Sequence, residues 1–159
     1  ERAALSRMTV YRRFPDVTSV LQALMWREFA ALLERSREET AEVTGEREQI
    51  IARAVRGLEL LSTHELFTRL LDVDPEMLLP YMTQRPGRFQ DAVAEQLATD
   101  LKAAMASGAV RDDDPKRLAR SIVLAMRGFA FAARDGSTRR QRQAASADVA
   151  LMLDGLLRP

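Results

Sequence analysis

The chain has 159 residues, of which 47% are hydrophobic and 30% are charged, and its formal net charge at pH 7 is +1. This composition is typical of a soluble globular domain with a substantial core. Because there is no cysteine and only one histidine (His64), disulfides, a cysteine nucleophile and zinc or di-iron clusters are excluded. No apolar run is long enough to span a membrane and no signal peptide is visible, so we expect a cytoplasmic protein.

Helical periodicity extends over most of the chain, and no stretch alternates as a strand does. A short first helix over residues 7–14 ends at Pro15, and Asp16 is the expected N-cap of a long amphipathic helix over residues 17–37. The polar residues 38–45 predict a linker. Further helices are expected around residues 50–61, around residues 66–71, and from Pro75 to a break at residues 85–87.

The C-terminal half predicts three longer helices. Residues 89–107 form the first of them, and Gly108 supplies its stop signal. The Asp114-Pro115 pair starts the second, which continues to about Arg134. A polar and basic loop over residues 135–142 then leads to a last helix over residues 144–157. The sequence therefore predicts an all-α fold without internal repeats.

The positive charge is concentrated at the start of the chain. Residues 1–14 contain four arginines and one glutamate, a local balance of +3, so the remaining residues sum to −2. Within the first helix, Val10 and Phe14 share an inward face, and Arg, Thr and Tyr occupy the rest of the surface. Arginine can read guanine edges, and Thr and Tyr hydroxyls can donate to phosphates, so this helix suits the DNA major groove. The alternative is a solvated helix face.

The first 16 residues, ERAALSRMTVYRRFPD, resemble the end of the helix-turn-helix in the tetracycline-repressor (TetR) family of bacterial transcription regulators. The chain departs from the family pattern at Val17, where a phosphate-contacting lysine is common, and in the turn, where Ala4 or Leu5 replaces a glycine. The first helix of the motif and most of the second are expected upstream of Glu1. The matching residues are Ala3, Leu5, Ser6, Thr9, Val10, Tyr11, Phe14 and Pro15.

The resemblance implies a partial helix-turn-helix followed by a multi-helix ligand-binding and dimerisation domain. Residues 1–37 would hold the recognition helix and the connecting helix, and residues 38–159 would form the C-terminal domain. Thr9 and Tyr11 would contact phosphates of a pseudo-palindromic double-stranded operator, and Arg7 and Met8 would lie nearest the bases. The complete set of DNA-binding residues would be Arg7, Met8, Thr9, Tyr11, Arg12 and Arg13.

The last two helices predict a surface for a second copy of the chain. Both are apolar over a wide arc, which indicates burial on more than one side. Two such helices from each subunit would form a four-helix interface, as in TetR-like proteins; the alternative is that they are central to their own subunit. The predicted interface residues are Val123, Ala130, Val149, Leu153 and Leu156.

Large, adaptable apolar side chains on the middle helices predict an effector pocket, because Met and aromatic residues suit varied apolar ligands. The alternative for each is an ordinary core position. His64 could donate a hydrogen bond to a ligand or have a structural role. The predicted pocket residues are Trp26, Phe67, Met77, Met82, Phe89, Met105, Met126 and Phe129.

Together these features predict a homodimeric, ligand-responsive transcriptional repressor that a small apolar or amphipathic effector releases from its operator. We expect it in the cytoplasm, associated with the nucleoid, without cofactor, metal or membrane contact. No spacing marks a catalytic site, so we do not expect an enzyme. The alternative function is a non-catalytic scaffold or protein-interaction domain that does not bind DNA.

Overall fold

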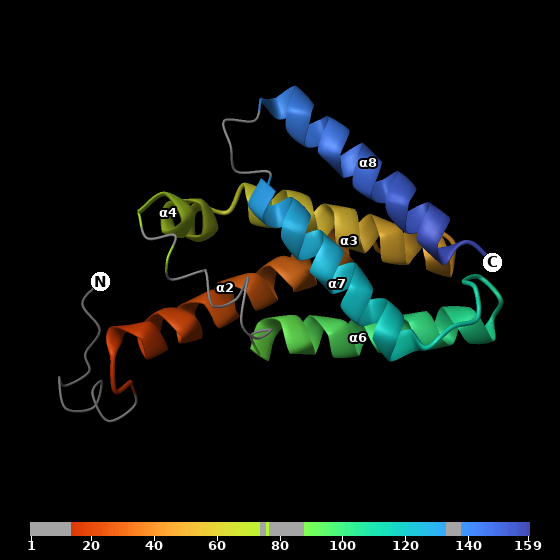
Figure 1. Ribbon diagram of the computed structural model, residues 1–159, viewed down its shortest axis with the longest axis horizontal. Helices are drawn as coiled ribbons and strands as arrows, with labels where there is room; N and C mark the ends of the chain where they lie inside the picture. The colour runs from red at the N-terminus through yellow and green to blue at the C-terminus, as the bar shows by residue number, and fades with distance from the viewer. Residues whose placement is uncertain (1–13, 74–75, 77–87, 133–137) are drawn as a thin grey trace.

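The computed structural model describes residues 14–73, 76, 88–132 and 138–159. These residues form α-helices and no strand, so the predicted all-α fold is confirmed (Figure 1). Apart from Phe14 and Glu76, the predicted helices over residues 7–14 and from Pro75 to residues 85–87 lie outside the described residues. The helices are α2 (Val17–Glu39), α3 (Glu46–Ser62), α4 (Glu65–Val73), α6 (Arg88–Ala106), α7 (Pro115–Ala132) and α8 (Arg139–Leu157).

The long helix α2 begins where the sequence predicted. The Asp16 carboxylate accepts a hydrogen bond from the backbone N–H of Ser19 at 2.7 Å, and the Ser19 hydroxyl oxygen accepts one from the backbone N–H of Asp16 at 3.4 Å. This reciprocal capping box satisfies backbone donors that the first turn leaves free. At the other end, the buried Thr40 hydroxyl donates to the Ser36 carbonyl at 2.7 Å. The helix therefore has defined stops at both ends.

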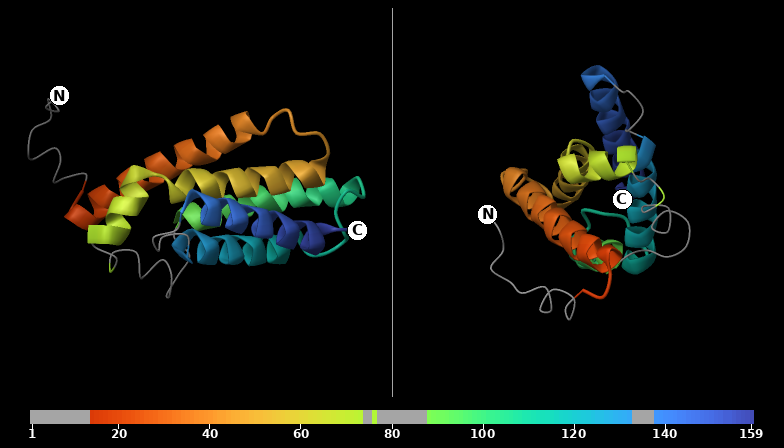
Figure 2. Two further views of the ribbon diagram at one scale, coloured as in Figure 1. Left: turned by 90° about the horizontal axis from the view of Figure 1, so that it is seen from above. Right: turned by 90° about the vertical axis from the view of Figure 1, so that its left-hand side faces the viewer.

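Helix α3 is the centre of the molecule, because it packs against α2, α4, α6, α7 and α8. Figure 2 shows α2 on one side of it and α7 on the opposite side. The buried side chains of α3 are Ile50, Leu58 and Leu60. At the contact with α2, Gly57 faces the buried Ser36, and a Cβ atom at Gly57 would lie 4.0 Å from the Ser36 hydroxyl oxygen.

The connection between α6 and α7 follows the two signals read from the sequence. Gly108 has φ of 77°, and beyond it the backbone N–H of Ala109 donates to the Ala104 carbonyl at 2.9 Å, which closes α6. Asp114 caps α7 by accepting a hydrogen bond from the backbone N–H of Lys116 at 2.9 Å. Both predicted boundaries are confirmed.

Helix α8 begins five residues earlier than the predicted start at Ala144. Thr138 and Gln141 form a capping box: the Thr138 backbone N–H donates to the Gln141 side chain at 2.7 Å, and the Thr138 hydroxyl accepts from the Gln141 backbone N–H at 3.3 Å. The first turns are polar and basic, so apolar periodicity could not predict them. At the other end, the Arg111 backbone N–H donates to the Leu157 carbonyl at 3.1 Å.

The most deeply buried side chains belong to α6, α7 and α8. Among the described helices, none combines the length and apolar character that crossing a bilayer requires. The largest side chains that are almost completely buried are Leu101, Leu118, Ile122, Val149, Leu153 and Leu157.

Candidate functional site

The predicted DNA-contacting segment immediately precedes the first described residue, Phe14, which is half-buried. Its residues connect through Pro15 to the capped start of α2, whose first turns expose Val17 and Val20. The predicted contacts lie outside the described residues: Arg7, Met8, Thr9, Tyr11, Arg12 and Arg13.

Five aromatic rings from four helices form a continuous aromatic cluster. Phe29 of α2 lies at its centre, with ring centroids 6.1 Å from Phe67 of α4 and 5.6 Å from Phe89 of α6. Trp26 of α2 extends the cluster to one side, 6.2 Å from Phe89, and Phe131 of α7 extends it to the other, 5.7 Å from Phe67. The rings meet edge-to-face or tilted, as aromatic pairs prefer. Because Trp26 is 44% exposed, the cluster reaches the surface there.

The aromatic cluster brings together Trp26, Phe67 and Phe89 of the predicted pocket. It also contains Phe29 and Phe131, which the predicted pocket omitted. Phe29 could have been found, because it follows Trp26 by three residues and so shares its helix face. Three other residues of the predicted pocket are half-buried against the core: Met105, Met126 and Phe129. The remaining two, Met77 and Met82, lie outside the described residues.

His64 lies beside the aromatic cluster, just before α4. Its ring centroid is 6.1 Å from that of Phe29, and the two rings meet edge-to-face. Its Nε2 lies 3.8 Å from a carboxylate oxygen of Glu28 on α2. Its other ring nitrogen, Nδ1, is buried and has no hydrogen-bond partner in the described part of the chain. An unpartnered polar atom therefore borders an otherwise apolar cluster.

A shallow groove of about 540 Å³ lies between α3 and α8. It shares no residue with the predicted effector pocket. Arg56 and Asp154 stand at its edges with two glutamates, and Arg56 is paired with acidic side chains of α2 and α3. The apolar residues that line the groove are Ile51, Ala52, Val55, Ala150 and Leu151.

The predicted dimer interface is wrong at three of its five residues. Ala130 is only 5% exposed, and Val149 and Leu153 are 0% exposed, because all three belong to the core of their own chain. Val123 and Leu156 are half-buried. Periodicity showed a wide apolar arc on both helices but could not decide which part of it faces inward. For the three buried residues, the alternative of a helix central to its own subunit is correct.

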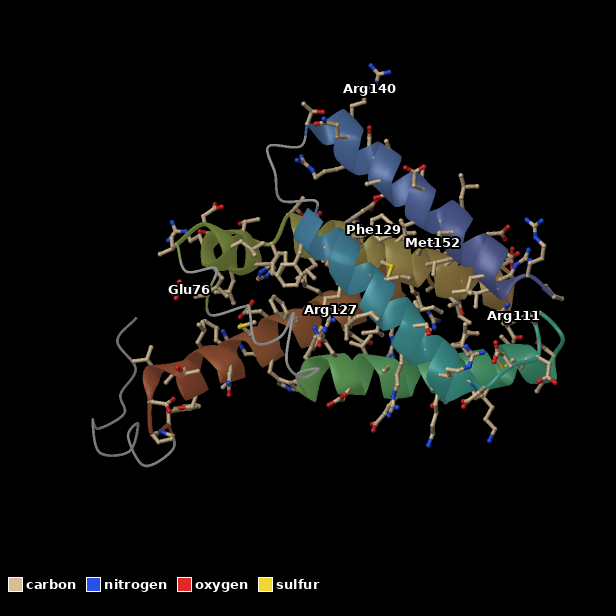
Figure 3. All side chains as sticks on the ribbon, in the orientation of Figure 1. Glu76, Arg111, Arg127, Phe129, Arg140 and Met152 are labelled. Atoms are coloured by element: carbon tan, nitrogen blue, oxygen red, sulfur yellow. The ribbon has the colours of Figure 1, made fainter. Side chains whose placement is uncertain are left out.

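The exposed apolar side chains of α7 and α8 define a different surface. Leu124 is 59% exposed, Leu151 71% and Met152 37%, and the nearby Gly128 and Gly155 are exposed. We call these five residues the α7–α8 outer face. Figure 3 shows Met152 where α7 and α8 diverge.

The carboxyl groups with shifted pKa values belong to ion pairs. Hydrogen bonds from Arg56 and then Arg35 lower the pKa of Glu39, and a hydrogen bond from Arg117 lowers the pKa of Asp113. Such pairs shift pKa values without marking catalysis. Within the described residues, no group of three or more His, Cys, Asp or Glu side chains could hold a metal ion.

Comparison with known sequences shows a relation to bacterial regulators. The chain is 33% identical, over 123 residues, to an uncharacterized HTH-type transcriptional regulator of Mycobacterium bovis, and 32% identical to counterparts in Mycobacterium tuberculosis. The aligned segment covers 77% of this chain and 62% of each relative. The chain therefore matches less than two thirds of the relatives' length. No protein-family model matches it.

Comparison with solved structures shows the fold. The R. erythropolis transcriptional repressor QsdR, from the TetR family, superimposes with a TM-score of 0.70. The superposition covers 98% of this chain and 81% of QsdR, and the two sequences are 19% identical. The similarity therefore extends over the helical body and over nearly the whole chain.

Proposed function

We propose that this chain, which has the TetR-type regulator fold and is related to HTH-type transcriptional regulators, works as a DNA-binding transcriptional regulator. The observation that carries the proposal is the sequence relation to HTH-type regulators over 77% of the chain. The match between the first 16 residues and the end of a helix-turn-helix supports it independently. The fold shared with QsdR, described as a transcriptional repressor, favours repression as the mode of regulation.

In this proposal the residues before α2 read DNA. Thr9 and Tyr11 contact phosphates, which position the helix without reading sequence, and Arg7 reads a base edge. Met8 lies beside Arg7, and Arg12 and Arg13 contact the backbone or flanking bases.

A homodimer presents two recognition helices to a pseudo-palindromic operator. The α7–α8 outer face supports this assembly, because it gathers three exposed apolar side chains and two glycines that permit close helix approach. A two-fold interface uses the same surface of both subunits, so Leu124 and Met152 each occur twice in it. Figure 2 shows that α7 lies on the side of α3 opposite α2, the helix that follows the predicted recognition helix in the chain.

Effector binding and DNA binding are coupled through α2. This helix carries Trp26 and Phe29 into the aromatic cluster, and only Pro15 and Asp16 separate its first residue from the predicted recognition helix. An effector that binds among these rings and favours one position of α2 changes operator affinity by its differential affinity for the two states. We propose that the effector is a small apolar or amphipathic molecule and that it releases the operator.

The DNA-binding proposal is tested by fluorescence anisotropy with the form of the protein that carries a complete helix-turn-helix. Operator and random duplexes are titrated against the wild type and single variants. Arg7→Ala should weaken operator binding by about 1–3 kcal/mol and leave random DNA nearly unaffected. Thr9→Ala should weaken both duplexes alike, because phosphate contacts carry no sequence information.

Two results would contradict the proposal. Equal weakening of operator and random DNA by Arg7→Ala would remove its base-reading role. Binding of the wild type to neither duplex at low salt would favour the scaffold alternative, in which the same helix contacts protein.

A further inference from the structure

One ring nitrogen of His64 has no hydrogen-bond partner in the described part of the chain. Nδ1 is buried, and a buried polar atom without a hydrogen bond is unfavourable. Three arginine Nε atoms share this condition in the described part of the chain, but each of those guanidinium groups forms an ion pair through another nitrogen. His64 differs from them because no hydrogen bond of its ring is present in that part. The unpartnered Nδ1 atom of His64 therefore lies beside apolar aromatic rings.

The surroundings of His64 decide which kind of group can pair with Nδ1. In a neutral imidazole one nitrogen carries the hydrogen and the other accepts. The Glu28 carboxylate, an acceptor, lies 3.8 Å from Nε2, so it favours the tautomer with hydrogen on Nε2. Nδ1 is then an acceptor, and its missing partner is a donor, such as a hydroxyl or an N–H group.

The aromatic cluster indicates the chemical nature of the apolar part of the ligand. Phe29 is the direct neighbour of His64, and Phe67 and Phe89 lie around Phe29. Rings that meet edge-to-face leave faces and edges that suit a planar aromatic guest. Trp26, at the exposed end of the cluster, provides the approach from solvent.

We propose that His64 is the polar anchor of the effector site and that the effector is an aromatic molecule with a hydroxyl or N–H donor. The donor pairs with Nδ1, and the aromatic ring of the effector packs against Phe29, Phe67 and Phe89. This inference rests on the effector-binding role proposed above. The groove between α3 and α8 is not the site, because none of the unpartnered polar atoms found in the described residues belongs to a residue that lines it.

The test uses phenol, anisole and toluene, three rings of similar size. Phenol can donate a hydrogen bond, anisole can only accept one, and toluene can do neither. Binding to the chain is followed at pH 8 by the indole N–H signal of Trp26, the single tryptophan, in ¹H–¹⁵N spectra. Phenol should bind about tenfold more tightly than anisole or toluene, the factor expected of one net hydrogen bond in a buried site. Only phenol should also shift the Nδ1 resonance of His64.

Two variants complete the test. His64→Phe keeps a ring in place, so all three probes should bind it with similar affinity. Val55→Ala, at the groove between α3 and α8, should retain the preference for phenol. Thermal melts establish that both variants are folded. Equal affinities of the three probes for the wild type, or a phenol preference that survives in His64→Phe, would overturn the proposal.

The outcome is separable from the proposed function. If phenol binds through His64 but a fully occupied site leaves operator affinity unchanged, the anchor stands and the coupling to DNA fails. If the protein binds operator but shows no preference among the probes, the regulator stands and the anchor fails.

Discussion

Arg56 of α3 donates a hydrogen bond from Nε to the carboxylate of Glu39, in the last turn of α2. Arg35, one turn earlier on α2, contacts the other oxygen of the same carboxylate at 2.6 Å. The Arg56 pair joins the C-terminal end of α2 to α3, close to the contact between Ser36 and Gly57, and Arg35 contacts the same carboxylate from within α2. The C-terminal end of α2 is therefore anchored to α3.

The Glu39 pairs should make stability depend on pH. The hydrogen bonds lower the pKa of Glu39 from its ordinary value of 4.5 in the folded chain. Because the pKa of Glu39 is lower in the folded than in the unfolded chain, its ionised carboxylate stabilises the fold at any pH above the unfolded pKa. This stabilisation is lost as the pH falls through the pKa of the folded chain. Urea melts should therefore show a smaller loss of stability between pH 6 and pH 3 in Glu39→Gln than in the wild type.

Glu38→Gln is the matched control for that measurement, because it removes the same charge one position earlier. It should retain the steeper pH dependence of the wild type. Identical slopes for Glu39→Gln and the wild type would show that the Arg56 contact does not persist in solution.

The same substitution should have a large effect on stability at one residue of α8 and a small effect at its neighbour. Leu153→Glu places an unpaired charge in the core, so it should cost more than about 4 kcal/mol and leave little folded protein. Met152→Glu lies on the α7–α8 outer face and should change the unfolding free energy of one subunit by less than about 0.5 kcal/mol. Circular dichroism measures both effects.

Light scattering at micromolar concentration tests the same face as an interface. The wild type should be a dimer, and Met152→Glu should dissociate it, because a two-fold contact brings the new charge close to its own copy. A dimer that tolerates both Met152→Glu and Leu124→Glu would place the interface elsewhere. A monomeric wild type would remove the assembly from the proposal.

Replacing glycine by alanine should change the stability of the fold in opposite directions at two positions. Gly108 has φ of 77°, where a side chain is strained, so Gly108→Ala should lower stability by about 1 kcal/mol. Gly57 is inside α3, and its new Cβ would make an ordinary contact with Ser36, so Gly57→Ala should raise stability by about 0.5–1 kcal/mol. Urea unfolding curves give both values, and a loss of stability in Gly57→Ala would mean that the α2–α3 contact is closer than 4.0 Å.

The aromatic cluster should contribute strongly to stability at its buried members. Phe67 is 4% exposed, so Phe67→Ala should cost about 3–5 kcal/mol. Val73→Ala, at a site 83% exposed, is the comparison and should cost less than about 0.5 kcal/mol. Differential scanning calorimetry distinguishes the two, and similar melting temperatures would place Phe67 outside the cooperative core.

The helix boundaries set by side chains with one dominant role could be predicted from the sequence. Asp16 after Pro15, Gly108, and Asp114 before Pro115 each stop or start a helix by local chemistry, and the structure confirms all three. The start of α8 could not be predicted in this way. It depends on a capping box between Thr138 and Gln141, within a stretch whose basic residues read as a loop.

The orientation of helix faces was the part that local patterns could not decide. Periodicity identifies an apolar arc but does not say which part of it meets the rest of the chain, so Val149 and Leu153 were assigned to the wrong neighbour. Contacts between distant segments were equally beyond local patterns. Nothing in the sequence around His64 indicates that Glu28 lies beside it or that Nδ1 lacks a partner.

The central position of α3 has a consequence for synthesis on the ribosome. This helix packs against α2, which precedes it, and against α8, which ends at Leu157, two residues before the last. Chains are made from the N-terminus, and segments that depend on distant partners acquire their packing late. The surface of α3 that α8 covers therefore stays open until α8 has been synthesised, and a nascent chain halted before residue 139 presents that apolar surface to chaperones.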